Sequence, residues 1–103
     1  MAWIKTVEQS HVEREGVAPA VVNGLRVALY CVDGQFYATS DMCTHALAWL
    51  SEGYLEDHLI ECPLHQGLFD IRTGAAAGAP CTEAIRTFPV RVEDGYLFVE
   101  YDG

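Results

Sequence analysis

Two short segments of the chain each combine a cysteine with a histidine. Cys43 stands two residues before His45, and Cys62 stands three residues before His65. A thiolate favours iron or zinc, and an imidazole suits both metals. Structural zinc sites commonly take two cysteines from one loop and two histidines from a helix, whereas here each segment supplies one of each. The pattern therefore favours a centre of two irons, one held by the cysteine pair and one by the histidine pair. Structural zinc remains the alternative.

These segments, Cys-Thr-His at 43–45 and Cys-Pro-Leu-His-Gln-Gly at 62–67, resemble the signature of Rieske proteins. From about Trp3 to Tyr101 the chain resembles the small soluble Rieske ferredoxins. The resemblance implies one [2Fe–2S] cluster. The cysteines at 43 and 62 would hold its buried iron, and the histidines at 45 and 65 its outer iron, where reduction occurs. Neutral imidazoles in place of two thiolates raise the reduction potential of such a centre.

The resemblance also implies a function. Bacterial ferredoxins of this type pass single electrons from an NAD(P)H-dependent flavoprotein ferredoxin reductase to the terminal Rieske oxygenase of an aromatic-ring dioxygenase. Such oxygenases also hold a mononuclear iron with two histidines and a carboxylate. Here only His11 and His58 remain, expected in an N-terminal loop and in a solvated turn. We therefore expect an electron carrier that is not itself an enzyme.

A second class of protein also carries a Rieske-like domain, namely the small subunit of assimilatory nitrite reductase. Those subunits frequently lack the cysteine ligands, whereas this chain keeps both cysteines and both histidines of the motif. The ferredoxin interpretation is therefore favoured over this alternative.

Rieske proteins of respiratory cytochrome complexes differ from this chain close to the motif. They carry further cysteines where this chain has Ala48 and Leu64, so the disulfide between the two loops is absent here. They also carry serine and tyrosine hydroxyls, which favour the reduced cluster, where this chain has Gly67 and Phe69. The resemblance therefore implies a low potential, toward about −150 mV. Ferredoxins of this type often have glycine at the position of Ala46, and we assign no effect to that difference.

Length and charge limit the possible functions. The 103 residues leave room for one domain, 1–103, and for no second catalytic module. No stretch approaches the roughly 18 apolar residues of a membrane span, and the start lacks a secretory signal. We expect a cytoplasmic monomer in which Cys31 and Cys81 are free buried thiols.

The net charge of −9 disfavours nucleic acid and membranes as partners. It either steers the protein onto basic partner surfaces or only keeps it soluble.

The turn and strand patterns predict an all-β fold. Asn-Gly or Asp-Gly pairs at 23–24, 33–34 and 94–95 are strong hairpin signals between β-rich runs. The expected strands cover residues 25–32, 35–39, 87–93 and 96–101, with Pro89 at an edge or at a strand start. Two short strands, 54–56 and 59–61, would meet in a turn at 57–58.

The resemblance places these strands in the Rieske fold. This fold is a small antiparallel β-sandwich or barrel base with an inserted two-loop cluster-binding lobe, at about residues 41–70. One helical turn is possible over 46–50. A loop over 74–80, with Pro80 as the matching proline, would cover the cluster.

Four large apolar residues stand near the proposed ligands, namely Leu47, Trp49, Leu64 and Leu68. The simpler interpretation is that they shield a cluster from water. The sharper hypothesis is that Leu47 and Leu64 form an apolar docking tip around the two histidines.

Overall fold

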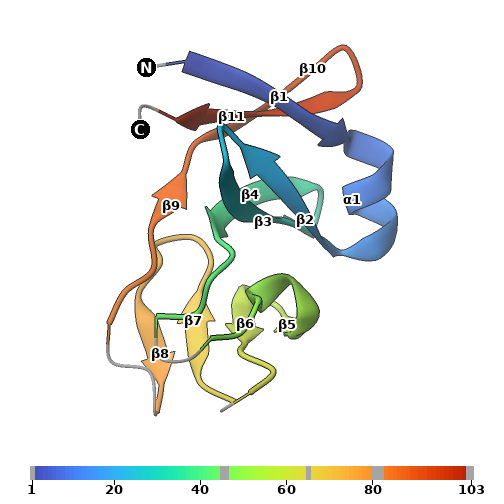
Figure 1. The fold of residues 1–103 in the computed structure, drawn as a ribbon. Helices are drawn as coiled ribbons and strands as arrows, with labels where there is room; N and C mark the ends of the chain where they lie inside the picture. Colours follow the sequence, from blue (N-terminus) through green and yellow to red (C-terminus); the bar gives the residue numbers. More distant parts are fainter. Residues whose placement is uncertain (1, 45–46, 65, 80–82, 102–103) are drawn as a thin grey trace.

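Three antiparallel sheets form the molecule (Figure 1). The structure, a computed structural model, describes residues 2–44, 47–64, 66–79 and 83–101. The first sheet contains, in spatial order, β1 (Ala2–Glu8), β11 (Tyr96–Tyr101) and β10 (Val90–Glu93). The middle sheet contains β2 (Val17–Val22), β3 (Leu25–Val32), β4 (Gln35–Ser40) and β9 (Thr87–Phe88). The third sheet contains β5 (Tyr54–Glu56), β6 (Leu59–Glu61), β7 (Leu68–Asp70) and β8 (Ala76–Gly78). The prediction of an all-β fold is confirmed.

Two apolar cores lie on opposite faces of the middle sheet. Alternate residues of a strand point to opposite faces, so β3 contributes Val27 and Leu29 to one core and Ala28 and Tyr30 to the other. The base core consists of Val12, Ala18, Val22, Val27, Leu29, Ala38, Phe88, Leu97 and Val99. The lobe core consists of Ala28, Tyr30, Cys43, Leu50, Ile60, Cys62, Phe69, Ile71 and Ile85. Burial of both faces explains why β3 is apolar along most of its length.

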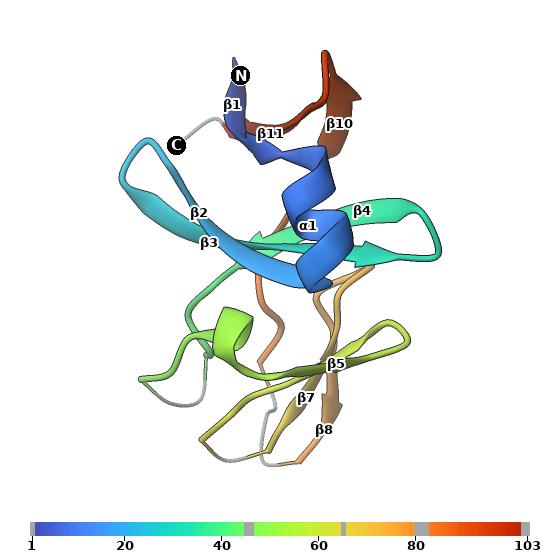
Figure 2. The same ribbon diagram turned by 90° about the vertical axis from the view of Figure 1, so that its right-hand side faces the viewer.

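The third sheet lies at the end of the molecule opposite β1, β10 and β11 (Figure 1). A short helix, α1 (Gln9–Glu15), runs beside β2 and β3 on the other side of the middle sheet (Figure 2). The third sheet is therefore held away from both α1 and the first sheet.

The three predicted hairpin turns are confirmed. Asn23, Asp33 and Asp94 have φ values of 49°, 51° and 53°, and the glycine after each also has a positive φ. Two consecutive positive φ angles define a type I′ turn, and the twist of this turn matches that of the flanking strands. These turns set the register of β2–β3, β3–β4 and β10–β11.

The prediction of one continuous strand over 87–93 is wrong. Thr87 and Phe88 pair with β4 in the middle sheet, whereas Val90–Glu93 pairs with β11 in the first sheet. Pro89 lies between the two segments and has no N–H group with which to continue a ladder. Its carbonyl oxygen instead accepts the N–H of Glu100 at 3.1 Å. The chain changes sheets at this proline.

Both expectations about helical structure need correction. His11 lies on α1 rather than in a loop, and this helix buries only Val12. So short an apolar face gives almost no periodic signal. The other helical turn is a 3₁₀ helix, η1 (Leu50–Glu52), which begins where the predicted turn at 46–50 ends. Ala46 lies outside the described residues.

The third sheet continues beyond residue 70. In the segment expected to be a loop over 74–80, β8 pairs with β7. The two strands pack tightly there, because a Cβ added to Gly78 would lie 3.1 Å from the Leu68 side chain. Pro80 lies outside the described residues.

Candidate metal centre

The two cysteine-bearing loops are closed by the same backbone contact. The N–H of Cys43 donates to the carbonyl of Ala48 at 3.0 Å, and the N–H of Cys62 donates to the carbonyl of Gly67 at 2.8 Å. We call residues 43–48 loop one and residues 62–67 loop two. In loop two, a second bond joins the N–H of Gln66 to the carbonyl of Cys62 at 3.0 Å. Each cysteine thus begins a closed loop of equal length.

Both cysteine side chains enter the lobe core. Cys43 is 3% exposed and Cys62 is fully buried, and both thiols are free. Because they belong to one apolar core, the fold brings together two of the four predicted ligands from separate loops. His45 and His65 lie outside the described residues. Within the described ranges, no three histidine, cysteine or carboxylate side chains gather closely enough to hold a metal ion.

The remaining cysteines were expected to be free and buried. Cys31 is free but only half-buried, on the face of β3 that packs against the base core. Its predicted burial is therefore wrong, because it lies near the end of β3, where cover from neighbouring elements is thinner. Cys81 lies outside the described residues.

A buried carboxylate holds the two ends of loop one together. Asp41 is fully buried, and its oxygens accept the Nε–H of Arg26 at 2.6 Å, the N–H of Ser51 at 2.7 Å and the Ser51 hydroxyl at 2.9 Å. Its backbone carbonyl accepts the N–H of Leu50 at 2.7 Å. The Arg26 guanidinium also lies over the Trp49 ring, 4.2 Å from the centroid. Asp41 therefore links the strand before the loop to the 3₁₀ helix after it.

Sequence reasoning missed the roles of Arg26, Asp41 and Ser51. The only local signal was a carboxylate two residues before Cys43. Its partners are 15 and 10 residues away along the chain, and no periodic pattern joins them.

The segment after residue 82 is tied by three hydrogen bonds to loop one, to the turn between β7 and β8, and to the end of β4. The Thr44 hydroxyl donates to the carbonyl of Glu83 at 3.0 Å. The N–H of Ile85 donates to the carbonyl of Gly74 at 2.8 Å, and the N–H of Ser40 donates to the carbonyl of Arg86 at 2.9 Å. This part of the chain therefore lies against loop one and β7–β8.

Two glycines permit close backbone approaches around the loops. A Cβ on Gly53 would collide with the carbonyl oxygen of Glu61, which directly precedes loop two. A Cβ on Gly74 would collide with the carbonyl oxygen of Ile85. Larger residues at either position would push apart the segments that frame the site.

A tyrosine joins the middle sheet to the lobe core. Thr39 donates its hydroxyl to the carbonyl of Ser40 at 2.8 Å, so the buried Tyr30 hydroxyl donates to Thr39 at 2.9 Å. Burial raises the pKa of the Tyr30 phenol well above its ordinary value, and the negative charge of Asp41 raises it further. Tyr30 therefore stays neutral at physiological pH.

The four large apolar residues near the loops divide into two pairs. Leu47 on loop one is 90% exposed, and Leu64 on loop two is 58% exposed. Trp49 and Leu68 are half-buried. Only the first pair presents most of its apolar surface to solvent, in line with the hypothesis of a docking tip.

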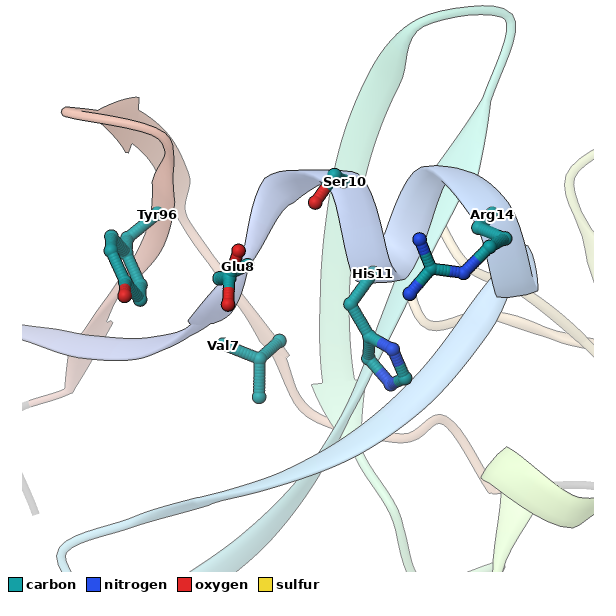
Figure 3. Close-up of a pocket in the computed structure, with 6 residues that line it drawn as sticks. All are labelled: Val7, Glu8, Ser10, His11, Arg14 and Tyr96. Atoms are coloured by element: carbon teal, nitrogen blue, oxygen red, sulfur yellow. The ribbon is translucent and has the colours of Figure 1, made fainter.

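The two remaining histidines belong to different surroundings. His11 lines a concavity of about 350 Å³ with Glu8, Arg14 and Tyr96, at the end of the molecule that carries α1 and β11 (Figure 3). His58 lies in the β5–β6 turn, as predicted. It is half-buried rather than solvated, because its ring meets Tyr37 edge-on at 5.7 Å.

Comparisons with known proteins identify this arrangement. Residues 2–89 match the Rieske [2Fe-2S] domain. The ferredoxin component of the naphthalene 1,2-dioxygenase system of Pseudomonas putida is 49% identical, over 95% of this chain and 94% of its own length. A ferredoxin structure from Sphingomonas yanoikuyae B1 matches with a TM-score of 0.91 and 35% identity, over 98% of this chain and all of the other.

A third match is a solved complex of reduced oxygenase and oxidized ferredoxin in carbazole 1,9a-dioxygenase. The matching chain has a TM-score of 0.85 and 41% identity, with 94% of this chain and 91% of that chain covered.

The chain belongs to the Rieske [2Fe-2S] domain family. Within that family it is a ferredoxin, an electron carrier rather than a catalytic enzyme. The resemblance to Rieske ferredoxins inferred from the two motifs is thereby confirmed. None of the helices in the described part of the chain has the length and apolar character needed to cross a membrane.

Proposed function

We propose that this ferredoxin passes single electrons from an NAD(P)H-dependent flavoprotein ferredoxin reductase to the terminal Rieske oxygenase of a multicomponent aromatic-ring dioxygenase. It would do so as a cytoplasmic monomer, in the catabolism of aromatic compounds. The observation that carries the proposal is the convergence of two free, buried cysteines from two equally closed loops, at one end of the molecule. The ferredoxin components among its relatives support the assignment to a dioxygenase system.

The proposed ligands are Cys43 and Cys62 for one iron, and His45 and His65 for the other, in one Rieske-type [2Fe–2S] cluster. The chemistry of the donor set fits, because two uncommitted thiols and two imidazoles in this order match that centre. Bound there, the cluster would take up and release one electron. The protein supplies burial on the cysteine side, where the lobe core excludes water.

The residues around loop two favour a low reduction potential. Gly67 and Phe69 are both buried and carry no hydroxyl group that could donate a hydrogen bond to the ligands. Without such donors the reduced state is less stabilised. We expect a potential well below zero, toward about −150 mV, and a value above roughly +100 mV would contradict the assignment.

The exposed Leu47 and Leu64 would form an apolar docking tip on the two loops. A solved complex between an oxygenase and a related ferredoxin supports the choice of the oxygenase as partner. The net charge of −9 supports partners with basic surfaces. A nitrite reductase subunit is disfavoured, because the relatives reported above are ferredoxins or ferredoxin components.

Visible and EPR spectra of the purified protein test the cofactor. We expect a coloured protein with an EPR signal after reduction, and iron and sulfide in equal amounts. A colourless, EPR-silent reduced sample that contains zinc would overturn the cluster. Cys62→Ser should lose the iron, whereas Cys31→Ser, which alters a free thiol on β3, should keep it.

Electron transfer to a terminal oxygenase tests the function and the docking tip. Leu64→Ser should slow reduction of the oxygenase while the cluster spectrum stays unchanged. The matched control is Val21→Ser, because Val21 is 64% exposed on β2, outside the lobe. Equal rates for the two variants would remove the docking role from Leu64.

A further inference from the structure

The outward face of the third sheet carries a groove next to loop two. The strand register places Tyr54 opposite Glu61 and Glu61 opposite Leu68, so these side chains form one row across three strands. Glu56, Leu59 and Asp70 form a second row. Between the rows, Ile60 and Phe69 point the other way and are buried in the lobe core. The groove is lined by Tyr54, Leu55, Glu56, Leu59, Glu61 and Leu68, and its volume is about 430 Å³.

The groove combines an exposed aromatic ring with an apolar floor. Tyr54 is 75% exposed, whereas Leu59 and Leu68, which also line the groove, are half-buried. Tyrosine is enriched in protein interfaces because it offers a large contact area and a polar hydroxyl at low entropic cost. This tyrosine makes no contribution to either core. Its position is therefore explained better by an interface than by packing within the chain.

The two carboxylates of the groove form no ion pair with any residue that the structure describes. They are Glu56 and Glu61, whereas Asp70 on the same sheet is paired with Arg72 at 2.9 Å. Two unpaired carboxylates beside an aromatic ring form a complementary site for a guanidinium or an ammonium group. Arginine fits best, since it can stack on the tyrosine and bind a carboxylate with two hydrogen bonds.

The groove is continuous with the proposed cluster site. Glu61 directly precedes Cys62, and Leu68 directly follows Gly67, so one row of the groove forms the stem of loop two. Among the residues that the structure describes, no equivalent row borders loop one, whose stem is the isolated Met42–Trp49 bridge and the buried Asp41. A protein seated on the tip would therefore find an extended surface only on the side of loop two.

We propose that this groove docks a cationic side chain, flanked by apolar surface, on the terminal oxygenase. This inference rests on the proposed function. It extends the surface that contacts the oxygenase from the tip along the side of loop two. The tip at Leu47 and Leu64 would contact the oxygenase close to the cluster, and the groove would select its orientation through Tyr54, Glu56 and Glu61.

The test measures how fast the reduced ferredoxin transfers electrons to the terminal oxygenase of the P. putida naphthalene 1,2-dioxygenase system, by stopped-flow spectroscopy. Tyr54→Ser should lower the second-order rate constant about tenfold, as expected for an interface aromatic. The double variant Glu56→Gln, Glu61→Gln should lower it by a similar factor and weaken its dependence on salt. The rate at saturating oxygenase and the cluster spectrum should stay unchanged in both.

The matched control for charge is the double variant Glu13→Gln, Glu15→Gln on α1, which removes the same charge far from the lobe. A loss equal to that of the groove variant would overturn the proposal in favour of general electrostatic steering. Slower electron uptake from the system's reductase, with normal transfer to the oxygenase, would assign the groove to the reductase and overturn it too. The proposal would also be overturned if the native protein formed a dimer and the Tyr54→Ser substitution abolished that dimer.

Different results would contradict the groove assignment and the proposed electron-transfer function. If the native protein and the groove variants reduce the oxygenase equally fast, only the groove assignment falls. If the native protein carries its cluster but does not reduce the oxygenase, the proposed function falls, and with it this occupant of the groove.

Discussion

Arg26 on β3 donates its Nε–H to the fully buried carboxylate of Asp41 at 2.6 Å. This contact joins the middle sheet to the residue two positions before Cys43. Since Asp41 also accepts two hydrogen bonds from Ser51, both ends of loop one depend on a single carboxylate. The charge of that carboxylate is balanced by Arg26 alone among the described basic residues.

Arg26→Met should therefore destabilise the fold strongly. Removal of one partner leaves a buried charge uncompensated, which costs about 3 kcal/mol. Urea unfolding monitored by circular dichroism would measure the change. Arg14→Met is the control, because Arg14 meets Glu15 only at 4.0 Å on the surface, and such pairs contribute roughly 0–1 kcal/mol. Similar losses for both variants would show that the Asp41 contact has no special role.

Gly74→Ala should be much more damaging than Gly95→Ala. Both glycines have positive φ values, +82° and +80°, so both substitutions incur a similar backbone strain of about 1–2 kcal/mol. Only at Gly74 would the new Cβ also collide with the carbonyl oxygen of Ile85, whereas nothing lies within 4 Å at Gly95. Thermal unfolding of the two variants, side by side, isolates the effect of the collision. Equal melting temperatures for the two variants would mean that the carbonyl of Ile85 does not closely approach Gly74.

Gln66→Gly should stabilise the protein. Gln66 has a φ of 60° in loop two, a conformation that glycine adopts without strain and that other residues adopt at a cost of roughly 1 kcal/mol. We expect a gain of about that size in the free energy of unfolding, in samples with the same iron content. A loss of stability would mean that the Gln66 side chain makes a contact that outweighs the strain.

Tyr30→Phe should change how stability depends on pH in alkaline solution. Because the pKa of Tyr30 is raised in the native state, the unfolded chain releases this proton first as the pH rises above about 10. The native state then holds more protons than the unfolded state, so stability falls with rising pH.

The native protein should therefore lose roughly 1.4 kcal/mol relative to Tyr30→Phe between pH 9 and pH 11. At pH 9 it should be the more stable of the two by about 1 kcal/mol, owing to the hydrogen bond to Thr39. Denaturant unfolding at both pH values measures these differences. Parallel losses in the two proteins would contradict the assigned shift.

Local patterns were sufficient for the hairpins. Asn23 and Asp33 adopt the positive φ angles that their turns require, and the strands beside them end within one residue of the prediction. Such turns are read correctly because their geometry depends on adjacent residues only. The sequence predicts only that Pro89 lies at a strand start or at an edge. The change of sheet at this proline depends on where two separate sheets lie, which the spacing of residues does not indicate.

Contacts between distant residues were not predictable in this way. The partners of Asp41 come from β3 and η1, and their approach depends on how the lobe packs on the middle sheet. The groove beside loop two is likewise a product of register. Tyr54, Glu61 and Leu68 share one face only because three short strands pair in one alignment.

The sequence by itself determined the family of this protein and predicted the ligands of its metal centre. Ligand type depends on residue identity, and the spacing of Cys43, His45, Cys62 and His65 is a local property of the chain. Tertiary structure alone decided which cysteines share a core, which apolar residues face solvent and which carboxylates are paired. Burial and pairing depend on packing between segments far apart in sequence, and that packing is set only when the three sheets assemble.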